Sequence, residues 1–207
     1  MSTSTKQRIL NASVRLFNEY GVDAVRLQQI AEEIGISVGN LAYHFKTKDA
    51  IIDSVYEQVV DQFAHIFRQY LQAPELAQFD QQLSLYYQFF QTYQFYLAEF
   101  FKETPDSDGR RGQWQRAVEK MLIQLRSWLD FHVQRNVLRP QTDPERYDQL
   151  AQTIWMTLVF FPASCAMRGQ SCDEIAYKQA VWKHLLPHFT EQGTAEYTEA
   201  VLPLIDY

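Results

Sequence analysis

The stretch GISVGNLAYHFKTKDA, residues 35–50, has the pattern of a tight turn, a short helix and the start of another helix. Gly35 is the residue type that accepts the left-handed backbone conformation at a helix end. Ser37 can cap the following helix by accepting a backbone N–H. Leu41 and Phe45 are four residues apart and therefore share the inward face of that helix. The polar residues between them are left for the outer face.

Two further helices are predicted before this stretch. Residues 6–20 carry an apolar stripe that ends at Gly21, and residues 27–34 have apolar side chains at the i, i+3, i+4, i+7 spacing of a helix. Three short helices with a tight turn between the second and third predict a helix-turn-helix. Because so small a kernel buries little surface, we expect a long fourth helix over residues 48–72 to support it.

The rest of the chain is also predicted to be helical. The 207 residues are 46% hydrophobic with only seven glycines and seven prolines, and no apolar–polar alternation is visible. The expected helical segments are 76–103 with a break near Thr92, 112–135, 144–168, 173–190 and 194–205. We therefore predict an all-α fold, with a helix-turn-helix domain over residues 1–50 and a larger helical domain over residues 51–207.

The charge distribution excludes a general basic footprint for nucleic acid. The net charge is −6, while residues 1–56 carry six basic and six acidic residues and are neutral as a group. Binding to DNA therefore has to depend on the side chains of one contacting face.

Other function classes have little support in the sequence. There is no phosphate loop, dinucleotide glycine motif or nucleophile elbow, so neither an enzyme nor a cofactor is expected. His184 and His188 have metal-ligand spacing but no third ligand nearby, so we expect no metal site. Cys165 and Cys172 do not make a disulfide framework, and the apolar run over residues 154–167 is short for a membrane span. We expect a cytoplasmic protein with no membrane contact.

Residues 6–54 resemble the amino-terminal domain of the TetR family of one-component transcription regulators. The matching pieces are Ile9-Leu10, Leu16-Phe17, Gly21, Ile30-Ala31, Gly35-Ile36-Ser37, Gly39-Asn40-Leu41, Tyr43-His44-Phe45 and Lys48. The chain differs from the family pattern at Ala42, where a tyrosine is usual, and at Val25-Arg26, where a small hydroxyl residue is usual. The resemblance implies double-stranded DNA as a partner.

Eight residues are candidates for DNA contact under this resemblance. They are Arg26, Ser37, Val38, Gly39, Asn40, Tyr43, His44 and Lys48. Asn40 offers a donor and an acceptor to a base edge, and Val38 offers an apolar contact to a thymine methyl group. Lys48 combines its charge with a helix amino terminus, which suits a phosphate. Taken singly, Tyr43 and His44 are equally well explained as shields of the apolar kernel.

The resemblance also implies a carboxy-terminal domain that binds a small molecule and forms a homodimer. Aromatic residues crowd the middle of the chain and suggest a pocket between helices, although any one of them is more often a core residue. The candidate pocket walls are Phe67, Tyr86, Phe90, Tyr93, Trp128 and Trp155. Because the sequence shows little sign of buried charge, an apolar or aromatic effector is expected.

The family pattern places the dimer interface on the last two long helices, here residues 144–168 and 173–190. The candidate interface residues are Ile154, Leu158, Phe161, Cys165, Val181, Leu185 and Phe189, which are equally able to pack on their own chain. The sequence thus predicts a ligand-responsive regulator that binds a palindromic operator as a homodimer. The expected regulator is a repressor. Two alternatives remain, a helical protein-binding module without DNA affinity and an all-α enzyme.

Overall fold

A computed structural model describes residues 4–70, 75–100, 110–143 and 145–205, with the side chains of residues 67–70, 100, 110, 111 and 113 excepted. Within these ranges every regular element is a helix, and the one β-type contact is an isolated bridge between Leu138 and Phe189. The predicted all-α fold is confirmed.

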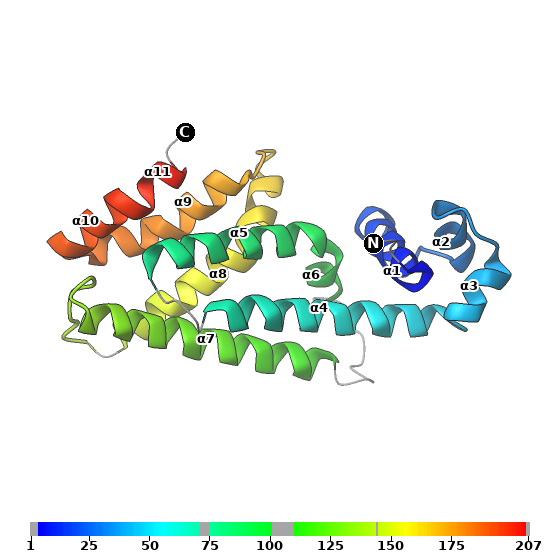
Figure 1. Ribbon diagram of the computed structural model, residues 1–207, viewed down its shortest axis with the longest axis horizontal. Helices are drawn as coiled ribbons and strands as arrows, with labels where there is room; N and C mark the ends of the chain where they lie inside the picture. Colours follow the sequence, from blue (N-terminus) through cyan, green and yellow to red (C-terminus); the bar gives the residue numbers. More distant parts are fainter. Residues whose placement is uncertain (1–3, 71–74, 101–109, 144, 206–207) are drawn as a thin grey trace. The chain divides into compact units, whose positions relative to one another are not determined.

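Figure 1 shows the order of the helices along the chain. They are α1 Thr5–Tyr20, α2 Leu27–Glu33, α3 Val38–His44, α4 Lys48–Tyr70, α5 Leu76–Thr92, α6 Gln94–Phe100, α7 Arg110–Gln134, α8 Arg146–Met167, α9 Glu174–Leu185, the 3₁₀ turn η1 Leu186–His188, α10 Glu191–Ala200 and α11 Leu202–Ile205.

The helices form two compact units, each drawn from two segments of the chain. The first unit contains Met1–Phe63 and Gln91–Gln113, and the second contains Ala64–Phe90 and Trp114–Tyr207. The boundary expected at residue 50 falls inside the first unit, which extends along α4 to Phe63 and also takes in the end of α5 and α6.

The core of the first unit is built from the residues that the helical periodicity placed inward. Ile9 and Phe17 of α1, Ile30 of α2 and Leu41 of α3 are fully buried. Ser4 and Ser37 accept backbone N–H groups from Gln7 and Asn40 and so cap α1 and α3. Left-handed backbone at Gly21 and Gly35 follows α1 and α2, as the sequence predicts.

Several helix boundaries differ from the predicted ones for local reasons. The break expected near Thr92 is confirmed, because α5 ends there and the chain turns at Tyr93 before α6. The segment predicted over 194–205 starts earlier, at Glu191, because Thr190 caps it by accepting the N–H of Gly193 at 3.0 Å. Gly193 lies inside α10, whereas the predicted segments 173–190 and 194–205 placed it between two helices.

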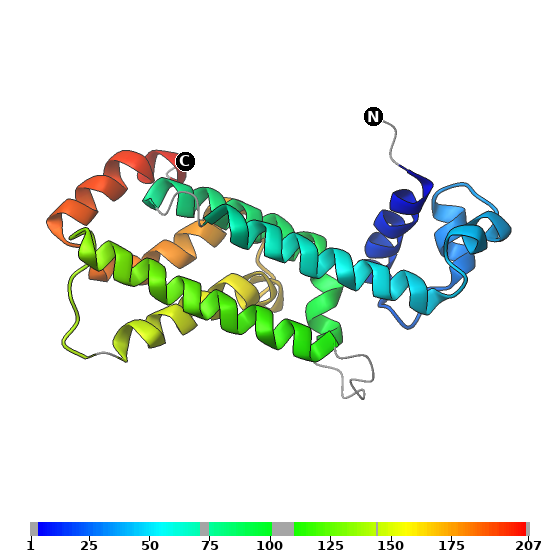
Figure 2. The same cartoon turned by 60° about the horizontal axis from the view of Figure 1, so that its bottom comes forward.

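The second unit packs α8 against α9, with α10 and α11 at the outer side of α9. Tyr177 of α9 donates its hydroxyl to the carbonyl of Leu158 in α8 at 2.8 Å. Gln179 of α9 donates to the carbonyl of Ile205 at the end of α11. Figure 2 shows α10 and α11, in orange-red and red, beside α9. The carboxy-terminal helices therefore cover part of the surface of α9.

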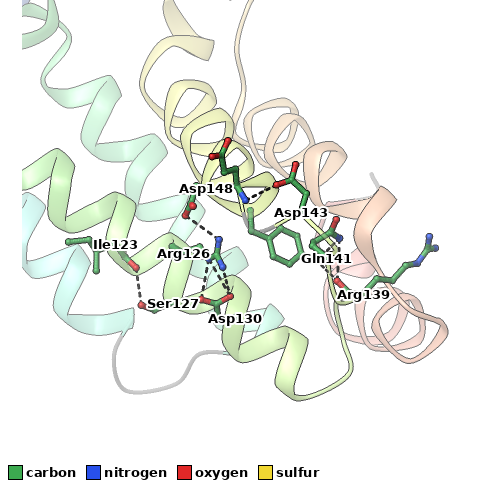
Figure 3. Close-up of polar contacts among 10 residues, drawn as sticks. Ile123, Arg126, Ser127, Asp130, Arg139, Gln141, Asp143 and Asp148 are labelled. Carbon is green, nitrogen blue, oxygen red and sulfur yellow. Dashed lines mark hydrogen bonds and ion pairs between the residues drawn. The ribbon is translucent and has the colours of Figure 1, made fainter.

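A polar network fixes the corner between α7 and α8 (Figure 3). Arg126 of α7 forms ion pairs with Asp130 on its own helix and with Asp148 near the start of α8, each at 3.1 Å. The carboxylates raise the pKa of the Arg126 guanidinium. Tyr147 donates its hydroxyl to the carbonyl of Arg139 in the intervening loop at 2.6 Å. These contacts lie at a half-exposed surface, so each contributes little to the stability of the fold. Their main effect is to fix the direction in which α8 leaves the corner.

Candidate nucleic-acid interface

Helix α3 presents one face to the core and one face to solvent. Leu41 is fully buried and Phe45 is 4% exposed, so these two residues anchor the helix. On the opposite face Tyr43 is 85% exposed, and Val38 at the amino-terminal end of the helix is 42% exposed. The ring and hydroxyl of Tyr43 are therefore accessible to a partner at the outer face of the helix.

The polar groups on the exposed face of α3 fall into two classes. The Ser37 hydroxyl accepts the N–H of Asn40 at 3.1 Å, so it serves the helix end. The Asn40 side-chain amide has no hydrogen bond to any described residue and is exposed to solvent. It therefore keeps both a donor and an acceptor for an outside group.

Tyr43 and His44 lie next to each other on this helix. Their rings meet edge to face, with centroids 5.2 Å apart. His44 is half-buried, whereas Tyr43 projects into solvent. The structure therefore supports a shielding role for part of His44 and leaves the ring of Tyr43 available for contact.

Two cationic candidates lie at the amino termini of helices next to α3. Lys48 begins α4, and its Nζ donates to the carbonyl of Asp23 at 3.0 Å. That bond uses one of three N–H donors, so the ammonium can still approach a phosphate. Arg26 precedes α2, and its backbone N–H donates to Oε1 of Gln29 at 2.8 Å while its side chain is exposed.

Gly39 lies on the same exposed face and has no packing reason to be glycine. A Cβ at this position would meet only the Ser37 hydroxyl, at 3.9 Å. Because Gly39 has no side chain, the backbone of α3 is uncovered between the side chains of Val38 and Tyr43.

Arg8 supports the turn between α2 and α3, and the sequence analysis did not single it out. Its Nη2 donates to the carbonyl of Ile34 at 2.6 Å, which satisfies a group at the end of α2. An arginine on the outer face of α1 gives no signal of this role, because its partner lies 26 residues away.

Comparison with known proteins agrees with this geometry. The sequence model of the family "Bacterial regulatory proteins, tetR family" matches residues 9–55, which include α2, α3 and the start of α4. Residues 9–55 thus match the amino-terminal domain of the tetR family. The HTH-type transcriptional regulator RutR of Escherichia coli (strain K12) is 39% identical over 59 residues, a match that covers 28% of each chain. The chain thus matches under a third of the length of this curated relative.

Solved structures extend the TetR-family fold over nearly the whole chain. A TetR-family transcriptional regulator from Marinobacter aquaeolei VT8 has a TM-score of 0.76 at 19% identity and covers 95% of this chain and 97% of its own. The ketosteroid transcriptional regulator KstR2 of Mycobacterium tuberculosis has a TM-score of 0.70 at 18% identity and covers 92% of this chain and 98% of its own. At these identities the likeness shows the fold alone.

The predicted pocket residues fall in both units, with Tyr93 in the first and the other five in the second. Tyr86 and Phe90 stack on one another in the second unit, with centroids 6.5 Å apart. Trp128 packs against Phe79 at 4.5 Å and is fully buried in the core. Tyr93 belongs to the first unit, where it is buried. The side chain of Phe67 lies outside the described part.

Two of these aromatic residues carry polar atoms in apolar surroundings. Burial raises the pKa of the Tyr86 phenol well above its ordinary value. Trp155 of α8 is half-buried, and its Nε1 is enclosed with no hydrogen-bond partner among the described residues. Tyr86, Phe90 and Trp155 therefore remain candidates for an effector site, while Trp128 serves the core.

The predicted dimer residues are mostly enclosed by their own chain. Phe161 is half-buried, whereas the other six are at most 3% exposed: Ile154, Leu158, Cys165, Val181, Leu185 and Phe189. Five of these side chains lie on α8 and α9 and Phe189 follows η1, and all six are in the core of the second unit. They are therefore not available at the surface for a second copy.

A different stripe of α8 faces outward. Thr153, Met156, Phe160, Ala163 and Met167 are exposed or half-buried, and their alternating spacing of three and four residues is that of a coiled-coil seam. By length and composition α8 qualifies as a membrane span, with a mean hydropathy of 1.4 in its most apolar window, of which 33% is buried. Much of its apolar surface is thus uncovered within one chain.

An ion pair in the core of the second unit was missed by the sequence analysis. Asp80 of α5 is 1% exposed and accepts from Lys178 Nζ at 2.9 Å and from Trp182 Nε1 at 3.0 Å. The expectation of little buried charge is therefore wrong at this position. The signal was present, because Asp80 and Lys178 both fall within the apolar stripes of their helices.

Proposed function

We propose that this chain is a DNA-binding transcriptional regulator of the TetR family that responds to a small molecule. The observation that carries the proposal is the exposed face of α3, where Asn40 keeps a free amide and Tyr43 is 85% exposed. Anchoring by Leu41 fixes the direction in which this face points. A rigid helix with free hydrogen-bonding groups and small residues is suited to the major groove of DNA.

Each candidate residue has a role in this proposal. Asn40 reads a base edge, preferentially adenine, with its donor and acceptor. Val38 contacts a thymine methyl group, and Tyr43 reaches either a base or a phosphate. Lys48 and Arg26 bind phosphates on either side of the groove, each next to a helix amino terminus. Ser37 and His44 position the helix and add contacts at its edge.

A homodimer follows from the geometry of double-helical DNA. One α3 helix covers only a few base pairs, and two successive major grooves on one side of the duplex are about 34 Å apart. We propose that two copies meet through the outward stripe of α8 defined above, which has unpaired apolar surface. The operator is then a palindrome, and a repressor acts by occupying it. This activity belongs in the cytoplasm.

The effector in this proposal is a small apolar or aromatic molecule bound in the second unit. Tyr86, Phe90 and Trp155 supply aromatic surface and, at Trp155, an unused N–H donor. One fold neighbour is a ketosteroid transcriptional regulator, and an apolar molecule of that class matches these aromatic side chains in polarity. The buried pair of Asp80 and Lys178 uses its charges internally and does not argue for a charged effector.

The test is selection of DNA from a pool of random duplexes by the purified chain. The expected result is enrichment of an inverted repeat with half-sites about one helical turn or more apart. Enrichment of no sequence, together with weak binding that salt abolishes, would favour the helical protein-binding module. Nothing in the site favours the enzyme, since its exposed groups include no acid, base and nucleophile in mutual contact.

A further inference from the structure

The first unit contains a hydrogen-bonded clamp between α1 and the corner of α5 and α6, defined here as residues 92–95. Asn18, near the end of α1, donates from Nδ2 to the carbonyl of Thr92 at 2.8 Å. Its Oδ1 accepts the backbone N–H of Phe95 at 2.9 Å. One side-chain amide thus satisfies the last carbonyl of α5 and an amide in the first turn of α6, groups that helix ends leave open.

A second tie joins the same corner to α4 and to the other end of α1. Gln58 of α4 donates from Nε2 to the Tyr93 hydroxyl at 2.8 Å. Its Oε1 accepts from Nε2 of Gln7 in α1 at 3.0 Å. The corner is therefore held at two points along α1, in addition to the edge contact between the rings of Phe17 and Phe95 at 5.5 Å.

The chemistry of the clamp is directional, unlike the apolar packing beside it. Phe17 is fully buried and already supplies the apolar contact between α1 and this corner. Apolar contacts allow a helix to slide, because burial depends on area and not on angle. A hydrogen bond weakens steeply when its angle changes. The two hydrogen bonds of Asn18 therefore fix the orientation of α1 at an interface that apolar contacts already bury.

Because α5 is one helix from Leu76 to Thr92, a displacement of its carboxy-terminal end reaches Asn18 directly. We propose that Asn18 is a positioning residue that transmits movement of the α5–α6 corner to α1, and through the packed kernel to α3. The inference rests on the proposed DNA-binding function. A shift of this corner favours one of two orientations of α3 and so changes operator affinity.

The variant that tests the clamp is Asn18→Ala, with Asn11→Ala as the matched control. Asn11 is an exposed asparagine on the same helix that accepts one N–H of the Gln7 side-chain amide, whose Nε2 also donates to Gln58, so Asn11→Ala removes an asparagine bond and leaves both bonds of Asn18 in place. Asn18→Asp is the second variant, because it keeps the acceptor for the Phe95 N–H and loses the donor to Thr92.

The measurement is fluorescence anisotropy on duplexes that carry the selected repeat with its half-sites moved apart or together by single base pairs. For Asn18→Ala we expect affinity at the preferred spacing to fall about three- to tenfold, the size of one or two lost hydrogen bonds. Affinity at neighbouring spacings should fall less, so the spacing preference becomes flatter. Asn18→Asp should lie between wild type and Asn18→Ala, and Asn11→Ala should match wild type.

Amide hydrogen exchange supplies an independent reading of the clamp. Exchange at the Phe95 N–H should accelerate in Asn18→Ala and stay unchanged in Asn11→Ala. An Asn18→Ala variant with wild-type spacing preference overturns the inference, as does a uniform loss at every spacing, which indicates general destabilisation. If the wild-type chain binds no duplex selectively, the proposed function itself fails, which is a different result from an insensitive variant.

Discussion

Lys178 and Asp80 form an ion pair in the core of the second unit, with 2.9 Å between Nζ and Oδ2. Trp182 donates to the other oxygen of the same carboxylate at 3.0 Å, so both oxygens of Asp80 are used. The pair joins α5 to α9 across 98 residues of sequence. Removal of one partner leaves an uncompensated charge in the core, whereas removal of both leaves only the neutral N–H of Trp182 without its acceptor.

Lys178→Met should therefore destabilise the chain strongly. We expect the free energy of unfolding to fall by about 3–5 kcal/mol, because the Asp80 carboxylate loses its counter-charge while it stays buried. Chemical denaturation followed by circular dichroism measures the loss. The double variant Asp80→Leu with Lys178→Met should recover most of it. A loss below about 1 kcal/mol in Lys178→Met, the size of an exposed pair, would contradict this assignment.

Gly193 and Gly39 should respond in opposite directions to alanine. A Cβ at Gly193 collides with the backbone carbonyl of Val137, so Gly193→Ala should cost roughly 1–3 kcal/mol through overpacking. A Cβ at Gly39 meets only the Ser37 hydroxyl, so Gly39→Ala should stabilise α3 by about 0.5–1 kcal/mol. Thermal unfolding of the two variants distinguishes these cases. A melting temperature that moves in the same direction in both variants would contradict the packing around these two glycines.

His188 should make stability depend on pH. Partial burial, together with the charges of Arg146 and Arg139, lowers the pKa of His188 below its ordinary value of 6.5. The unfolded state therefore binds a proton more readily than the folded state, so this contribution is complete above about pH 6.5 and is lost as pH falls through the folded pKa. Thermal unfolding between neutral pH and pH 5 should show a smaller loss for His188→Asn than for wild type. An identical pH profile in the two proteins rules this role out.

Met156→Glu should weaken the homodimer. The side chain is 55% exposed on the outward stripe of α8, and a carboxylate there places two like charges near the axis of a symmetric interface. Ile123→Glu is the matched control, because Ile123 is a 67% exposed apolar residue on α7. Sedimentation velocity should show a dimer for wild type and for Ile123→Glu and a monomer for Met156→Glu. A dimeric Met156→Glu, or dissociation by Ile123→Glu, argues for a different interface.

The DNA-binding helices were the most predictable part of the molecule because their signals are local. The Ser37 hydroxyl caps α3 by accepting the N–H of Asn40, which is only three residues away. Gly35 lies in the turn before α3, and Leu41 is the buried residue within that helix. The family resemblance then predicted which of the exposed residues contact DNA. The clamp of Asn18 had no such signal, since Thr92 lies 74 residues away and an exposed asparagine near a helix end is common.

The second unit was less predictable because its helices are apolar on more than one side. In α8 both the stripe that contains Ile154 and the stripe that contains Met156 have helical spacing, and the sequence does not say which one faces the core. The structure buries Ile154 completely and leaves Met156 half exposed. Contacts across distant segments, such as Asp80 with Lys178, decide that choice.

The most direct test of the central claim is Asn40→Ala measured by anisotropy on the selected duplex and on a scrambled duplex at several salt concentrations. For wild type we expect the selected duplex to bind at least about a thousandfold more tightly than the scrambled one, with steep salt dependence for both. Asn40→Ala should lose about 1–3 kcal/mol of this discrimination and keep its affinity for the scrambled duplex. Equal affinity of wild type for the two duplexes, or discrimination unchanged by Asn40→Ala, would contradict the assignment of α3 as the helix that reads DNA.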